Sequence, residues 1–195
     1  MLTRHEISRG VYGAWLLLLG DRRGLDWIDR SPLGAWRSFL LAPLLFPFDL
    51  VNIAVAAAEL NSHASWARIL AVEIVTYTIS WAAYPLVMLG LAPMLDRERQ
   101  ILGFIAVSNW TSTITSALSL ILSLLLWSEI LPDAIANLLI FLQLAILFVY
   151  GWFVIKTALE VRPLLAAGLS VMQLIIAIIL SQITYAMILQ AGLRG

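Results

Sequence analysis

The sequence contains no cysteine and only two histidines, His5 and His63, in 195 residues. Disulfide bonds, thiolate nucleophiles and cysteine-ligated metals are therefore excluded. The histidines lie far apart, without a ligand at the spacing that zinc sites use, so we expect no metal site. A Walker-type phosphate loop and an HExxH motif are also missing. We therefore expect a protein that is not an enzyme and has no catalytic residue and no cofactor, while a pigment, quinone or lipid between helices stays open.

Charged residues are scarce as well. They make up 12% of the chain, whereas 62% of it is hydrophobic, and a soluble domain is nearer a quarter charged. A chain of this length cannot bury so much apolar surface in one water-facing core. The lipid bilayer is therefore the expected solvent. The formal net charge is zero, so no overall field favours a nucleic-acid partner.

Long hydrophobic runs, in contrast, are abundant. Five of them reach the ~20 residues that a spanning helix needs, at residues 38–58, 69–95, 101–127, 134–159 and 164–189. The links between them are short, so consecutive helices should be antiparallel neighbours. Pro132 and Pro163 stand where a helix restarts, a position that tolerates a missing N–H. We predict an all-α integral membrane protein with a five-helix transmembrane domain over residues 38–190.

Basic residues alternate between the two ends of these helices. One side carries the basic residues of the amino-terminal segment, of the second link and of the fourth-to-fifth boundary, namely Arg4, Arg9, Arg22, Arg23, Arg30, Arg37, Arg97, Arg99, Lys156 and Arg162. The other side has only two basic residues. Arg68 accompanies the first link (residues 59–63), and Arg194 is at the end of the chain. The positive-inside rule places the amino terminus in the cytoplasm and the carboxyl terminus outside.

Residues 1–37 form a different, cytoplasmic or interfacial segment. Thr3 and Glu6 have the spacing of a capping box, which predicts a helix start. The apolar surface of this helix would come from Val11, Tyr12, Trp15, Leu16, Leu18 and Leu19. We expect a short interfacial amphipathic helix in the headgroup region, serving either as a lipid or curvature sensor or as a plain anchor. Ser31 and Pro32 are typical of an N-cap and first position of the next helix.

Asp49 is the clearest ionisable residue inside a predicted span. A charge in hydrocarbon is costly, so such residues are candidates for function. Asn52 shares its helix face, and Pro43 and Pro47 free backbone carbonyls nearby. Either Asp49 relays a proton or cation, or it is a packing residue in a broken or re-entrant stretch. We expect the first crossing to be the least regular.

Two further polar stripes complete the candidate set. Glu73 and Tyr77 share a face of the second span, which lines a cavity or makes interhelical hydrogen bonds worth ~0.6 kcal/mol each. Ser112 and Ser116 belong to a series of small hydroxyl residues in the third span, which forms a packing seam or a solute-binding face. The candidate intramembrane polar cluster is therefore Asp49, Asn52, Glu73, Tyr77, Ser112 and Ser116.

Short motifs accompany this layout, at residues 99–100, 104, 108–110, 150–152, 158–160 and 164–167. Together with the five spans they resemble the Yip (Ypt-interacting protein) domain family over about residues 38–189, as a compact bacterial-type member. The aromatic Asn109-Trp110 pair and the Tyr150-Gly151-Trp152 junction carry the resemblance. It implies a bacterial inner membrane and a role in membrane organisation. The long acidic arm of vesicle-traffic members is missing, so we expect no GTPase partner.

Two functions follow from these patterns. The first is a non-enzymatic membrane scaffold or accessory subunit that packs against copies of itself or other inner-membrane proteins. The alternative is a small transporter or channel with a polar cavity around Asp49 and Glu73. The transporter or channel function requires the polar residues of three spans to meet in space.

Overall fold

A computed structural model describes residues 2–59 and 65–192, and every regular element in these ranges is helical. The elements are α1 (Arg4–Leu18), η1 (Arg22–Trp27), α2 (Pro32–Ser38), α3 (Leu41–Glu59), α4 (Trp66–Leu91), η2 (Pro93–Leu95), α5 (Ile101–Trp127), α6 (Asp133–Ala158) and α7 (Pro163–Gly192). Most of the first predicted link, residues 60–63, lies outside the described residues.

Within the described residues, five helices are long and apolar enough to cross a membrane, which confirms the predicted number of spans. They cover residues 32–58, 66–91, 101–127, 133–158 and 163–188. The second span was predicted to run to residue 95, and this end was wrong. Pro93 has no N–H to donate to the carbonyl four residues earlier, and α4 ends at Leu91 ahead of the short helix η2.

The first crossing is broken near its start. α2 ends at Ser38 and α3 begins at Leu41. Pro43 has no N–H to return to the Phe39 carbonyl, which instead accepts the Ala42 N–H at 3.0 Å. This three-residue turn separates α2 from α3 within one span. The first crossing is therefore irregular, as expected from the sequence.

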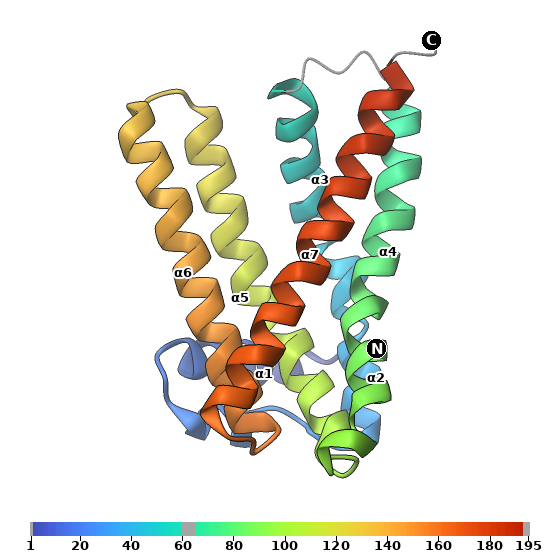
Figure 1. Cartoon of the computed structure of the whole chain (residues 1–195), viewed down its shortest axis with the longest axis vertical. Coiled ribbons are helices and arrows are strands. Elements are labelled where there is room, and N and C mark those ends of the chain that lie inside the picture. The colour runs from blue at the N-terminus through green and yellow to red at the C-terminus, as the bar shows by residue number, and fades with distance from the viewer. Residues whose placement is uncertain (1, 60–64, 193–195) are drawn as a thin grey trace.

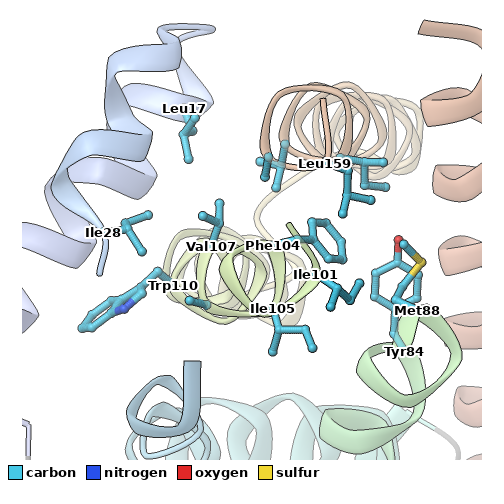
Figure 2. Close-up of a cluster of buried hydrophobic side chains, with 14 of the residues drawn as sticks. Leu17, Ile28, Tyr84, Met88, Ile101, Phe104, Ile105, Val107, Trp110 and Leu159 are labelled. Carbon is cyan, nitrogen blue, oxygen red and sulfur yellow. The ribbon is translucent and has the colours of Figure 1, made fainter. Parts of the chain in front are cut away.

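The hydrophobic core surrounds the first half of α5 (Figure 2). Phe104 and Val107 of this helix are almost wholly buried. Leu17 of α1 approaches from one side, and Met88 of α4 lies on another. Leu159, at the end of α6, closes the cluster and has no exposed surface. α5 is therefore the central element on which the others pack at this end.

α1 packs against α5 and η1 through small residues. Its buried positions are Gly10, Gly13, Ala14 and Leu17, and they let the backbones approach closely. The apolar residues predicted for this helix are not these buried positions, and one of them, Trp15, is 48% exposed. The capping box of Thr3 and Glu6 is present, as is the Ser31 N-cap of α2. α1 is an integrated part of the bundle, and its interfacial position stays a prediction.

The bundle is closed at one end and open at the other (Figure 1). α1, η1 and α2 lie around the closed end, where α5, α6 and α7 also meet. Towards the other end, α5 and α6 form a hairpin that diverges from α3, α4 and α7. α7 packs on both α6 and α4 and so connects the two groups.

Candidate functional site

Four of the six predicted polar residues meet in one cavity between α3, α4 and α7. Its volume is about 240 Å³. The predicted residues in its wall are Asp49, Asn52, Glu73 and Tyr77. Hydroxyl groups from two helices add to the wall, from Thr76, Ser80, Ser181, Thr184 and Tyr185. The cavity therefore holds two carboxyls, an amide and several hydroxyls at a site surrounded by apolar helices.

The two carboxyl groups share one cavity wall. Glu73 is only 4% exposed, and it lines the same cavity as Asp49, close enough for the two side chains to interact. Within residues 2–59 and 65–192, no backbone N–H or other side chain donates to Glu73. Two carboxylates in contact repel one another when both are charged, which favours a single proton held between them. The pair is thus suited to taking up and giving back one proton.

The depth of the pair follows from the helix geometry. α4 has 26 residues, which gives it about 39 Å at ~1.5 Å per residue. The hydrocarbon core is about 30 Å thick, so a few ångströms of α4 extend beyond it at each end. Glu73 is seven residues after Trp66, or about 10 Å along the axis. For an upright α4 centred in the bilayer, Glu73 lies within the hydrocarbon, a few ångströms from its boundary, in the half of α4 away from the closed end of the bundle.

Tyr77 has two roles in the wall of the cavity. Its hydroxyl donates to the Ala42 carbonyl at 2.7 Å, which links α4 to the first turn of α3. Its ring packs on Phe46 with 5.0 Å between the ring centroids. These contacts hold α3 and α4 together one turn from Glu73, and they fix the distance between the helices that carry the two carboxyls.

Ser112 and Ser116 do not join this cavity, so the prediction of one cluster was wrong for them. Ser112 lines a separate cavity of about 320 Å³ between α5, α6 and α7. Ser116 is half-buried further along α5 and belongs to neither wall. The divergence of α5 from α3 and α4 (Figure 1) separates these serines from the carboxyls.

The structure adds a wall on α7 that the predicted cluster did not include. We call the cavity lined by Ser112 the hydroxyl cavity and the cavity lined by Asp49 and Glu73 the carboxyl cavity. Ser170 and Gln173 line the hydroxyl cavity, whereas Ser181 and Thr184 line the carboxyl cavity. Ala177 lines both. The spacing of three or four residues places all five on one helix face. That spacing is visible in the sequence and is the signal by which this wall could be found.

No group of three or more histidine, aspartate or glutamate side chains that could hold a metal occurs in the described ranges. The comparisons with known proteins add no family: no family model, curated protein or solved structure matches this chain.

Proposed function

We propose that this protein is a small transporter or channel that binds and releases a proton at the Asp49–Glu73 pair. The observation that carries the proposal is that the buried Glu73 and the partly buried Asp49 line one cavity. Ionisable side chains inside spanning helices are costly and are therefore candidates for function, and here two of them line one cavity. The pair gains one proton from water on one side of the membrane and returns it on the other.

A row of polar groups along α7 supports the proposal. Ala177 of α7 lines both the carboxyl cavity and the hydroxyl cavity. Hydroxyl and amide groups stand on both sides of this residue, from Ser181 at the carboxyl cavity to Gln173 towards the closed end. Water and hydroxyl groups in such a row can pass protons by hydrogen bonding. A larger side chain at Ala177 should therefore interrupt the path without touching the carboxyls.

Proton flux into reconstituted vesicles tests the proposal. A pH-sensitive dye inside the vesicles reports acidification after a membrane potential is applied. We expect flux with the natural chain and only the rate of protein-free vesicles with Asp49→Asn or Glu73→Gln. Glu129→Gln, in the exposed link after α5, is the matched control and should retain the flux. Full flux with Asp49→Asn would contradict the proposal.

The scaffold or accessory-subunit function remains the second candidate, because the α5–α6 hairpin exposes large apolar side chains. These include Ile121 (63%), Trp127 (59%), Leu138 (54%) and Phe141 (66%). Such a surface meets lipid or the helices of another protein. In this role, as a compact Yip-like protein of a bacterial inner membrane, the chain would pack against copies of itself or other membrane proteins. A strictly monomeric protein without co-purifying partners after mild solubilisation would argue against it.

A further inference from the structure

A third cavity with polar walls lies at the closed end of the bundle, away from the carboxyl pair. It has a volume of about 340 Å³ and lies between α1, α2, the link before α2, and α5. Trp110 and Ser38 line it, together with the small residues Gly10 and Gly34. The volume is within the ~300–1,000 Å³ range of small-molecule sites. The cavity is therefore large enough for a small polar group of a ligand.

The charged side chains of this cavity are balanced in sign. Arg9 and Arg37 are positive, Glu6 and Asp29 are negative, and His5 is the remaining titratable group in the wall. Arg37 and Glu6 pair with each other at 2.7 Å. A purely anionic or purely cationic ligand would therefore meet like charge on one wall, whereas a ligand that carries both signs would not.

Arg9 retains capacity for an anion. Its guanidinium donates to the Asp26 carbonyl at 3.3 Å and lies 5.8 Å from the Trp27 ring centroid. In the part of the chain that the structure describes, no carboxylate pairs with it. A carbonyl and an aromatic ring leave its positive charge uncompensated, so a phosphate oxygen would be a favourable partner.

Asp29 retains capacity for a cation. One oxygen of its carboxylate accepts the Ser31 N–H at 3.0 Å, and no described lysine, arginine or histidine pairs with it. Asp29 lies against Gly34, where a Cβ atom would overlap both the backbone carbonyl and the carboxyl carbon of Asp29. A glycine at this position thus makes room for Asp29 as a whole in the wall of the cavity, on a different segment from Arg9.

We propose that this cavity binds a phosphoethanolamine group, with its phosphate on Arg9 and its ammonium on Asp29. A primary ammonium can donate hydrogen bonds to the carboxylate, which the quaternary ammonium of choline cannot. The cavity is at the end of the bundle that carries most of the basic residues, which the positive-inside rule places beside the cytoplasmic headgroups. The phosphoethanolamine headgroup of a bilayer phospholipid is therefore its expected source. This site is independent of proton movement at Asp49 and Glu73.

Native mass spectrometry of the full chain in detergent tests the site. The protein is titrated with phosphatidylethanolamine, phosphatidylcholine and phosphatidylglycerol that have identical acyl chains. We expect phosphatidylethanolamine to bind more tightly by on the order of tenfold, the effect of one charge-assisted hydrogen bond. Asp29→Asn should remove the preference over phosphatidylcholine, and Arg9→Gln should weaken the binding of all three lipids.

Matched controls come from the same segments. Arg4→Gln is on α1, and Asp26→Asn precedes α2, but neither side chain lines the cavity; both variants should behave as the natural chain does. Soluble phosphoethanolamine in excess distinguishes a site for the free group from a site for the whole lipid. If it displaces the lipid, the headgroup alone is sufficient for binding. If the lipid is retained, the acyl chains are also needed. Equal binding of the three lipids, or equal effects of Arg9→Gln and Arg4→Gln, would overturn the proposal.

Discussion

The indole of Trp110 on α5 packs directly against Gly10 of α1, and a Cβ atom at Gly10 would overlap the ring. We predict that Gly10→Ala forces α1 away from α5 and lowers the melting temperature. Overpacking costs about 1–3 kcal/mol, which exceeds the gain of up to about 1 kcal/mol from replacing a helical glycine by alanine. Circular dichroism during heating in detergent measures the effect.

Gly90 of α4 provides the control for this substitution. A Cβ atom there would have no atom within 4 Å, so Gly90→Ala has only the favourable change in helix propensity. Its melting temperature should equal or exceed that of the natural chain. If Gly10→Ala were equally stable, the contact with Trp110 would not be what holds α1 against the bundle.

Two buried tyrosines differ in their hydrogen bonding and should respond differently to loss of the hydroxyl. The Tyr150 hydroxyl donates to the Ala14 carbonyl at 2.7 Å, joining α6 to α1. The Tyr84 hydroxyl is buried without a partner in the described structure, close to Met88 (Figure 2). We predict that Tyr150→Phe destabilises the fold by about 1 kcal/mol, whereas Tyr84→Phe is neutral or stabilising.

Thermal unfolding of the two phenylalanine variants, side by side, decides this prediction. Both substitutions remove one oxygen and keep the ring, so packing changes are matched. Equal losses of stability would mean that the hydroxyl of Tyr84 has a partner of its own, or that the bond from Tyr150 contributes nothing.

The coarse architecture was predictable because it depends on local signals. Runs of apolar residues set the five spans, and the prolines at 132 and 163 mark the starts of α6 and α7. The face shared by Asp49 and Asn52 follows from helical periodicity. Their meeting with Glu73 was expected only as one of two alternatives, since it depends on how α3 rotates against α4.

The errors arise where close packing or helix divergence decides. The face of α1 that packs on the bundle was not predicted: it contains Gly10 and Gly13, which meet the Trp110 ring and the Gly24 carbonyl, and hydropathy gives glycine little weight. Ser112 and Ser116 lie on a suitable stripe, yet α5 leaves the α3–α4 group along its length. Periodicity describes one helix at a time, so it contains no information on this divergence.

Acid should weaken the contact between α1 and α2. The Glu6 carboxylate accepts the Thr3 N–H at 2.8 Å and pairs with Arg37 at 2.7 Å. The hydrogen bond from the Thr3 backbone, with smaller effects from the Thr3 side chain and Arg37, lowers the pKa of Glu6. The stabilising effect of the Glu6 carboxylate is therefore complete above the ordinary glutamate pKa of about 4.3. It is lost as the pH falls through the lowered pKa of Glu6 in the folded state.

Amide hydrogen exchange in α1 measures this response. We expect faster exchange at the start of α1 below about pH 4 than at pH 6, after correction for the intrinsic rates. Glu6→Gln should show the fast exchange at both pH values. Glu98→Gln, an exposed carboxyl in the link before α5, should follow the natural chain. Unchanged protection of the natural chain in acid would show that the Glu6 contacts do not hold this end of α1.

The absence of native cysteine allows a direct test of topology with single introduced thiols. Glu98 lies in the link before α5, and Ile130 lies in the link after it with 78% of its surface exposed. One crossing separates the two positions, so they must face opposite sides of the membrane. The basic residues favour the cytoplasm for Glu98. In intact cells, a membrane-impermeant maleimide should label Ile130→Cys at once and Glu98→Cys only after permeabilisation. Labelling of both from one side would contradict a spanning α5, and the reverse pattern would contradict a cytoplasmic amino terminus.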